Sequence, residues 1–262
     1  MTKAQIIAIT NQKGGVGKTT TAVNLATALA ASKRRVLVVD ADPQGNAGTG
    51  FDVSSDALQK DLYRLVAGQT TISQAITPTK VDSVDLLPAS TDLAALEVEL
   101  VDKSDRNNRL KSILDSIADR YDYMLIDCPP SLGLLTVNAL VAADSVLIPL
   151  QCEYYALEGL SHLMDTIQRV QKGLNPRLTI KGVLLTMYDS RNKLSSMVDA
   201  DVRGHLTSLV YKTIIPRNVR VSESPSHGQP VLLYDIDCAG SSAYIALAAE
   251  VIKQETREVA HA

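Results

Sequence analysis

The stretch Ile6–Thr21, IIAITNQKGGVGKTTT, decides how the rest of this chain folds. Its first residues are apolar and predict a short buried strand. A turn with three glycines follows, at Gly14, Gly15 and Gly17, and a helical pattern begins near Thr20. A strand, a glycine-rich turn and a helix in this order are typical of a phosphate-binding loop.

The residue types in this loop suit an anion. Glycines permit positive φ and let backbone N–H groups approach a phosphate closely. The helix that follows directs its positive end at the same place. We expect Lys18 to reach the β- and γ-phosphates and the Thr19 hydroxyl to bind Mg²⁺. The alternative, a glycine-rich turn without a ligand, is disfavoured because the strand before it and the helix after it support the motif.

The loop departs from the common G-x-x-x-x-G-K-[ST] pattern. Gln12 stands where the first glycine of that pattern should be, and a second lysine, Lys13, precedes the glycine pair. Taken alone, Lys13 is equally well explained as a solvated charge at the end of a strand. Beside an anion-binding loop, a functional role becomes the better interpretation.

Length and composition set broad limits. The chain has 262 residues, a net charge of −3 and 45% hydrophobic residues, enough to bury a sizeable core. No apolar run approaches the ~18 residues of a membrane span, and no signal peptide is visible. Cys128, Cys152 and Cys238 are far apart and form no C-x-x-C pair, so we expect buried thiols in a reducing cytosol rather than a metal or redox site.

Apolar runs alternate with helical patterns along the chain. The sequence predicts strands at 6–9, 36–39, 84–87, 123–126, 145–150 and 180–187, with a further apolar segment at 212–215. It predicts helices at 22–31, 58–66, 72–76, 92–100, 109–120, 134–142, 156–172, 194–209 and 241–259, and a loop at 225–230. We therefore expect an α/β fold: one doubly wound, mostly parallel sheet with helices on both faces, forming a single domain over residues 1–262.

Carboxylates follow two of the predicted strands. Asp40 and Asp42 come after the strand at 36–39, and Asp127 ends the strand at 123–126. In open α/β sheets the ligand binds at the carboxyl ends of the strands. An Asp at the end of an apolar strand is the usual partner of a phosphate loop and holds Mg²⁺, often through water. The alternative is an Asp that merely ends a strand and starts a turn.

Four segments together resemble a known family. KGGVGKTTTAVNLA, VVDADPQGN, LIDCPPSLG and TIIPRNVRVSESPSHGQP are similar to the motifs of the ParA/Soj family of chromosome- and plasmid-partitioning ATPases. The chain looks like the short type, which lacks an N-terminal DNA-binding extension, and the resemblance runs from about Ile6 to Val251. The wider class is the P-loop ATPases with a deviant Walker A motif, which includes MinD and the nitrogenase iron protein.

The resemblance implies a role for each matching residue. Lys13 would cross a nucleotide-sandwich dimer and touch the phosphates bound to the partner subunit. Asp42 would position the attacking water, Asp40 would support the magnesium shell, and Asp127 would be the Walker B aspartate. The phosphates would be held by Gly14, Gly15, Val16, Gly17, Lys18, Thr19 and Thr20, and the adenine would be contacted by Pro216 and Asn218.

These roles imply a switch that uses ATP and Mg²⁺. Phosphoryl transfer needs charge stabilisation at the γ-phosphate and an oriented water, so hydrolysis would be slow in a monomer and coupled to formation of a homodimer. The ATP-bound dimer would bind DNA without sequence preference, and a ParB-like centromere-binding protein would stimulate hydrolysis and release it. The expected location is the cytoplasm, in association with the nucleoid.

The mildly acidic net charge means that DNA contact needs a local basic patch. Residues 181–230 carry seven Lys and Arg against four Asp and Glu, without aromatic residues interleaved in a stacking pattern and without a helix-turn-helix signature. This composition favours contact with phosphates rather than base readout. Arg191 and Arg220 match positions that the family uses for DNA, and Arg217 lies in the same segment. Charge alone would favour a solvated basic face.

Three other functions were weighed. A MinD-like membrane-cycling ATPase needs a basic amphipathic C-terminal helix, whereas the tail KQETREVAHA is mixed in charge and has no Phe, Trp or Leu cluster, so we expect no membrane partner. A reductase like the nitrogenase iron protein needs a cysteine set that this chain does not resemble. A DNA-binding scaffold with a purely structural nucleotide is disfavoured by Asp42 and Asp127.

Overall fold

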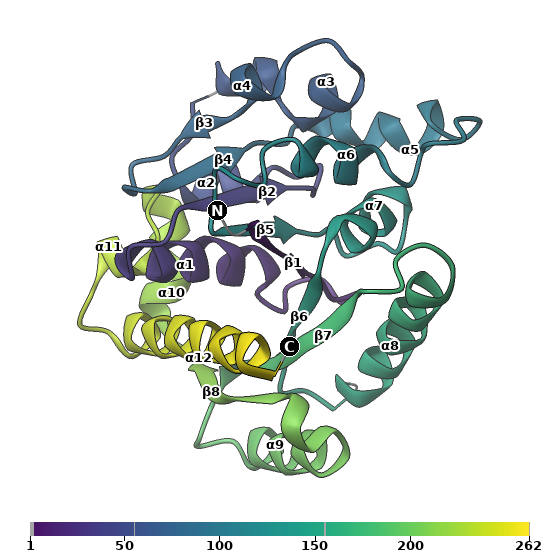
Figure 1. Ribbon diagram of the computed structural model, residues 1–262. Coiled ribbons are helices and arrows are strands. Elements are labelled where there is room, and N and C mark those ends of the chain that lie inside the picture. The colour runs from purple at the N-terminus through teal and green to yellow at the C-terminus, as the bar shows by residue number, and fades with distance from the viewer. Residues whose placement is uncertain (1–2, 55, 155, 262) are drawn as a thin grey trace.

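One sheet runs through the computed structural model, which describes residues 3–54, 56–154 and 156–261 (Figure 1). Within these residues it has eight strands in the order β3-β4-β2-β5-β1-β6-β7-β8, and each neighbouring pair is parallel except β3 with β4. The strands are β1 (Gln5–Ile9), β2 (Val36–Asp40), β3 (Thr77–Pro78), β4 (Val84–Leu87), β5 (Tyr123–Asp127), β6 (Ser145–Gln151), β7 (Thr179–Tyr188) and β8 (Val210–Pro216). The expected α/β fold class is confirmed.

Helices cover both faces of the sheet. The α-helices are α1 (Lys18–Ala31), α2 (Asn46–Gly50), α3 (Leu62–Val66), α4 (Ile72–Ala75), α5 (Leu96–Glu99), α6 (Arg109–Asp115), α7 (Leu134–Ala142), α8 (Ala156–Gly173), α9 (Lys193–Leu206), α10 (Val219–Glu223), α11 (Val231–Tyr234) and α12 (Ala239–His261). Short 3₁₀ turns are η1 (Ala57–Lys60), η2 (Thr91–Ala95), η3 (Thr207–Leu209) and η4 (Ser224–His227). Within the described ranges, no helix is both long and apolar enough to cross a membrane.

The two faces of β1 explain why its run of apolar residues is continuous. Ile6 and Ala8 belong to one buried cluster, together with apolar residues of α6, α7 and α8. Ile7 and Ile9 belong to the other, which contains apolar residues of α1 and α12. Figure 1 shows α1 and α12 together on one side of the sheet, with α7 and α8 on the other. A central parallel strand is buried on both faces, so it has no polar face to alternate with.

Two helix ends differ from the expectation. The helix expected over 109–120 ends at Asp115, and the helix expected over 194–209 ends at Leu206, followed by η3. Thr207 has φ 36°, a conformation that a right-handed helix cannot continue through. Apolar spacing identifies which side chains are buried, but several successive turns can bury the same residues as one longer helix.

The segments at 58–66 and 225–230 also differ. The first is not one helix, because Asp61 separates η1 from α3 and accepts a hydrogen bond from the Arg64 N–H at 3.0 Å. This is a side-chain cap, which starts a new helix at that point. The second was expected to be a loop, but its first part lies in η4.

The strand order brings the predicted functional segments together. β1, which leads into the glycine-rich turn, lies between β5 and β6, and β2 lies on the other side of β5. The register pairs Ile9 with Asp127 and Asp40 with Asp127. The carboxyl ends of parallel strands meet at one edge of the sheet, so these residues lie side by side there.

Candidate nucleotide-binding site

The glycine-rich turn joins β1 to α1 and has a left-handed backbone at two points. Gly15 has φ 74° and Gly17 has φ 89°. A Cβ at Gly17 would have no atom closer than 3.9 Å, so it is the backbone conformation, and not a lack of space, that favours glycine. Gly17 directly precedes α1, which begins at Lys18 rather than near Thr20. The loop and the helix N-terminus therefore have the arrangement of an anion-binding site.

Lys18 occupies the first position of α1 with only 7% of its surface exposed. Its Nζ donates a hydrogen bond to the backbone oxygen of Lys13 at 3.1 Å. Burial lowers the pKa of Lys18, and the nearby charges of Asp127 and Asp42 oppose that shift. The ammonium is thus held against the loop and balanced by carboxylates, in the position expected for a phosphate-binding lysine.

Asp40 and Asp42 have different surroundings. Both oxygens of the buried Asp40 accept backbone hydrogen bonds, from the Asp42 N–H at 3.1 Å and the Ala47 N–H at 3.0 Å. Burial raises the pKa of Asp40, and the charge of Asp127 adds to this. Asp42 lines the cleft, and its Oδ1 accepts from the Gln44 N–H at 3.0 Å. In this structure Asp40 shapes the turn that presents Asp42 to the cleft.

Asp127 is a fully buried carboxylate, and among the described residues neither of its oxygens has a hydrogen-bond partner of normal geometry, although the Thr19 hydroxyl lies close to it. Burial raises its pKa to about 7, and the negative charge of Asp42 adds to this, while the Thr19 hydroxyl and the Lys18 charge oppose it. A buried carboxylate without a partner destabilises the folded protein unless a cation lies beside it. A bound Mg²⁺ would be such a cation.

A cleft of about 540 Å³ opens over these strand ends. It is lined by the predicted residues Gly14, Gly15, Gly17, Lys18, Thr19, Thr20, Asp42, Pro216 and Asn218, and also by Arg217. Val16 is buried beneath the loop, and Asp40 and Asp127 lie below the surface of the cleft. The structure therefore brings together the phosphate end and the expected adenine end, although these are about 200 residues apart in the chain.

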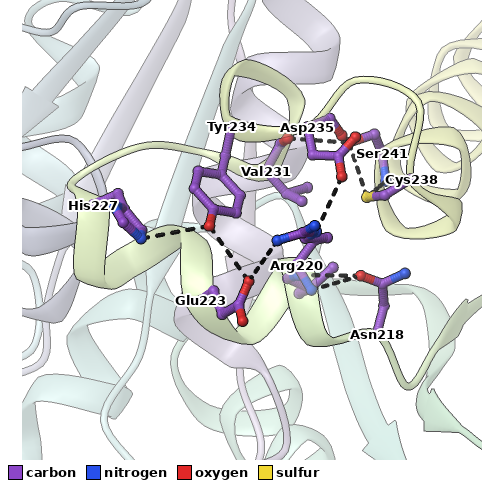
Figure 2. Close-up of polar contacts among 10 residues, drawn as sticks. Asn218, Arg220, Glu223, His227, Val231, Tyr234, Asp235, Cys238 and Ser241 are labelled. Carbon is purple, nitrogen blue, oxygen red and sulfur yellow. Dashed lines mark hydrogen bonds and ion pairs between the residues drawn. The ribbon is translucent and has the colours of Figure 1, made fainter.

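The expected adenine end is built around the cap of α10 (Figure 2). Asn218 Oδ1 accepts from the Arg220 N–H at 2.9 Å and from the Val221 N–H at 3.4 Å. The first turn of α12 packs closely on this cap, because a Cβ at Gly240 would lie 2.2 Å from a methyl of Val221. The N–H of Val231 donates to Asn24 Oδ1 of α1 at 2.7 Å. Helix α11, which follows this region in the chain, is thus joined to the helix that follows the phosphate loop.

Several residues that line the cleft were not predicted. They are Gln44, Asn46, Pro130, Thr186, Met187, Ile215, Val221, Ser222, Pro225 and Tyr244. Thr186, Met187 and Ile215 lie at the carboxyl ends of β7 and β8, so the strand-end rule could have indicated them. Tyr244 lies in the second turn of α12, and no local pattern distinguishes it from an ordinary core residue.

Lys13 does not line the cleft of its own chain. Its ammonium forms an ion pair with Glu153, in the turn after β6, and 46% of the Lys13 side chain is exposed. Its backbone N–H donates to Asn11 Oδ1 at 3.0 Å, and the buried Asn11 in turn donates to the oxygen of Pro149 at 2.8 Å. The backbone of Lys13 is fixed, while its charge lies at the rim of the site.

The three arginines expected at DNA lie in different surroundings. Arg217 lines the cleft. Arg191 is 87% exposed in its side chain and forms a two-point ion pair with Asp189, which lowers the pKa of that carboxyl to about 2. Figure 2 shows Arg220 between two carboxylates, with N–O distances of 3.1 Å to Glu223 and 3.3 Å to Asp235.

The positive excess of residues 181–230 does not form one patch of free cations. Lys181 is only 9% exposed and donates to Gln5 Oε1 at 3.1 Å. Arg203 pairs with Asp199 at 2.6 Å. The partners of Arg191, Arg203 and Arg220 include Asp189, Asp199 and Glu223, which are among the four acidic residues of the segment, and Asp235 is a further carboxylate beside Arg220.

The residues present fit a nucleotide with its magnesium ion. Backbone amides at a helix N-terminus, a buried lysine and a threonine hydroxyl suit phosphates. Among the described residues the oxygens of Asp127 have no hydrogen-bond partner of normal geometry, and a bound cation would balance its charge. In the described part of the chain no group of three or more His, Cys, Asp or Glu could hold a metal. Mg²⁺ commonly uses one or two protein ligands together with phosphates and water. The fold and this site define a P-loop nucleotide-binding protein.

Comparison with known proteins gives the family. A family model described as an AAA domain matches residues 4–180. The chromosome partitioning protein ParA of Caulobacter vibrioides is 55% identical over 253 residues, which cover 96% of this chain and 95% of that protein. The sporulation initiation inhibitor protein Soj of Bacillus subtilis is 53% identical over 247 residues, covering 94% and 98%. The chain therefore belongs to the ParA/Soj family of chromosome-partitioning ATPases, as its motifs indicated.

A solved structure has a similar fold. The cobyrinic acid a,c-diamide synthase from Mycobacterium smegmatis, with bound ADP and magnesium, has a TM-score of 0.85 and 36% identity, covering 97% of this chain and 96% of that one. ATP and Mg²⁺ are the cofactors expected for the ParA/Soj family, and the cleft has the residues that fit both.

Proposed function

We propose that this protein is a single-domain ATPase of DNA segregation, in which ATP joins two copies into a sandwich dimer and hydrolysis separates them. The support is the family, the nucleotide cleft and the position of Lys13. Lys13 is not among the residues that line its own cleft, and its exposed ammonium pairs with Glu153. A cation exposed at the edge of a phosphate site is available to a phosphate bound by a second copy.

The chemistry of the site supports hydrolysis of ATP to ADP and phosphate. Thr19 and Asp127 are placed to hold Mg²⁺, which when bound supplies positive charge to the phosphates. Lys18 adds a second positive charge from within the chain. Asp42 has one oxygen engaged by the Gln44 N–H, and among the described residues none donates to its other oxygen. That oxygen is the group that we assign to orienting the attacking water.

Removing the charge of Lys13 tests the dimer. Lys13→Gln should bind ATP with nearly unchanged affinity but should remain monomeric with ATP, because the contact in trans is lost. Lys103→Gln, an exposed lysine outside the cleft, is the matched control. Light scattering with ATP, with ADP and without nucleotide is the measurement. A Lys13→Gln protein that dimerises normally with ATP would remove Lys13 from the interface.

We propose further that the ATP dimer binds DNA through phosphates, with Arg191 and Arg220 among the contacts. The support is the family resemblance and the exposure of both guanidinium groups at the surface. Each lost phosphate contact should reduce the salt slope of DNA binding by about one unit. Arg191→Ala and Arg220→Ala should show this on unrelated duplexes. Arg169→Ala, an exposed arginine on α8, should not. Equal slopes in all proteins would remove the arginines from the interface.

A ParB-like protein is the proposed activator, and the nucleoid is the proposed location. Both follow from the family and from the partitioning names of the relatives. Phosphate release should rise when DNA and a ParB-like partner are added together. Sedimentation with anionic liposomes and ATP tests the alternative, a MinD-like membrane cycle: the proposal predicts that the protein stays in the supernatant, and cosedimentation that depends on ATP would favour the alternative.

A further inference from the structure

A residue far from the phosphate loop in sequence holds that loop in place. Thr186 lies near the end of β7 and is 2% exposed. Its hydroxyl donates a hydrogen bond to the backbone oxygen of Val16 at 2.9 Å. Val16 belongs to no helix or strand, and among the described residues no other hydrogen bond to its backbone oxygen occurs. Strand β7 thus provides the fixed partner of the loop's central carbonyl.

Because the peptide bond is planar, the hydrogen bond from Thr186 to the Val16 oxygen also sets the direction of the next N–H, which we assign to phosphate binding. In a trans peptide the C=O and the following N–H point in opposite directions, and the chain has no cis peptide bond among its described residues. Because the Val16 oxygen is turned toward Thr186, the N–H of Gly17 is turned away from Thr186. Gly17 lines the cleft and lies directly before α1. The side chain of Thr186 therefore fixes the direction of the Gly17 amide.

The left-handed glycine explains why such a restraint is needed. Gly17 has φ 89°, and a glycine can also adopt the right-handed conformation at little cost. A Cβ at this position would meet nothing closer than Thr186 at 3.9 Å, so the space beside the Gly17 Cα is open. The loop is anchored at its start by Asn11, which binds the Lys13 N–H. Thr186 supplies a second anchor at its centre.

The end of β7 is itself a fixed point. Met187, the residue after Thr186, has φ 49° although it is not a glycine. Such a conformation persists only where the surrounding structure holds it. Thr186 thus lies in an irregular part of β7, where the register with β8 shifts between Leu185 and Tyr188.

We propose that Thr186 is a positioning residue for nucleotide binding, which acts by holding the Val16–Gly17 peptide so that its amide faces the phosphates. This inference rests on the nucleotide-binding part of the proposed function and not on dimerisation, DNA binding or hydrolysis. It predicts that the hydroxyl matters for nucleotides in general, since ADP and ATP use the same loop.

The test compares three substitutions. Thr186→Val removes the donor with almost no change in shape, and Thr186→Ser retains the hydroxyl. Thr213→Val is the matched control: Thr213 also donates its hydroxyl, to Glu250 at 2.9 Å, but lies on β8 outside the cleft. Calorimetry measures the affinity for Mg-ADP and Mg-ATP. Hydrogen exchange of peptides covering the loop is measured on the nucleotide-free protein, and the melting temperature of each variant is recorded.

We expect Thr186→Val to weaken both nucleotides about tenfold, the effect of leaving a buried carbonyl unpaired and its amide misdirected. We also expect faster exchange in the loop, while Thr186→Ser and Thr213→Val bind like the parent. Wild-type affinity in Thr186→Val, or an equal loss in Thr213→Val, would overturn the proposal. A parent protein that binds nucleotide but neither dimerises nor hydrolyses would refute the proposed function and leave this inference standing.

Discussion

Replacing Asp127 by Asn should stabilise the nucleotide-free protein while it damages the magnesium site. Asp127 is 0% exposed, and among the described residues neither of its oxygens has a hydrogen-bond partner of normal geometry. A carboxylate in this position is retained at a cost to stability, which its role with a cation would explain. The Asn variant keeps the shape of the side chain and removes the charge.

The size of the effect follows from the pKa. Burial raises the pKa of Asp127 from its ordinary 3.8 to about 7. Below about pH 4 the group is protonated in both states and costs nothing. As the pH rises toward 7, the unfolded chain ionises more readily than the folded one, so the wild type loses stability. Three pH units correspond to about 4 kcal/mol at roughly 1.4 kcal/mol per unit. The buried amide of Asn would also lack a hydrogen-bond partner, which reduces this gain in stability by about 1–3 kcal/mol. A net gain of about 1–3 kcal/mol above pH 8 raises the melting temperature by about 3–8 °C.

Thermal unfolding between pH 5 and pH 8.5 measures this, without nucleotide and with chelator present. The advantage of Asp127→Asn should be small at pH 5 and largest at pH 8.5. Asp61→Asn is the matched control: Asp61 is also 0% exposed, but its oxygens are bound by Arg64 and Ser90, so this variant should lose stability. With Mg-ATP the wild type should gain more than Asp127→Asn. A variant that melts at or below the wild-type temperature at every pH would refute the reasoning.

Two further predictions concern the cleft. Asp42→Ala should bind ATP and dimerise but release phosphate at least about 100-fold more slowly, because it lacks the group that orients water; release at the parental rate would exclude that role. Gly240→Ala should weaken ATP binding and lower the melting temperature by several degrees, since the new Cβ would lie 2.2 Å from Val221 and close to Asn218. Gly204→Ala, in open space on α9, should instead raise the melting temperature by about 2–4 °C.

The sequence allowed prediction of those parts of the site that depend on neighbours along the chain. The glycines, Lys18 and Thr19 form a local pattern that can be recognised from residue types and spacing alone. The strand ends that carry Asp40 and Asp127 could be found because continuous apolar runs indicate strands buried on both faces. For Pro216 and Asn218 only the family resemblance pointed to the nucleotide, and the structure places both at the cleft.

The remaining features depend on contacts between distant segments. Nothing near Thr186 in the sequence indicates that its hydroxyl meets Val16, 170 residues away. Asp40 resembles a metal-site carboxylate in sequence, yet both of its oxygens bind backbone amides, which only the folded turn reveals. Arg217 was grouped with the DNA-contact residues, and only the structure reveals that it also lines the nucleotide cleft. Residue type and segment charge do not specify which partner a side chain meets.

The pairing of the exposed cations changes how the proposed switch should be understood. Lys13 pairs with Glu153, Arg191 with Asp189, and Arg220 with Glu223 and Asp235, so each cation that we assign to an external phosphate already has a carboxylate partner in its own chain. Engaging a second subunit or DNA is then an exchange of ion pairs. Exposed pairs of this kind contribute only about 0.2–1 kcal/mol each, so the exchange costs little and can reverse easily. A protein that must bind and release DNA repeatedly needs weak ion pairs of this kind within its own chain. Without them, the free cations would bind DNA more strongly in both nucleotide states.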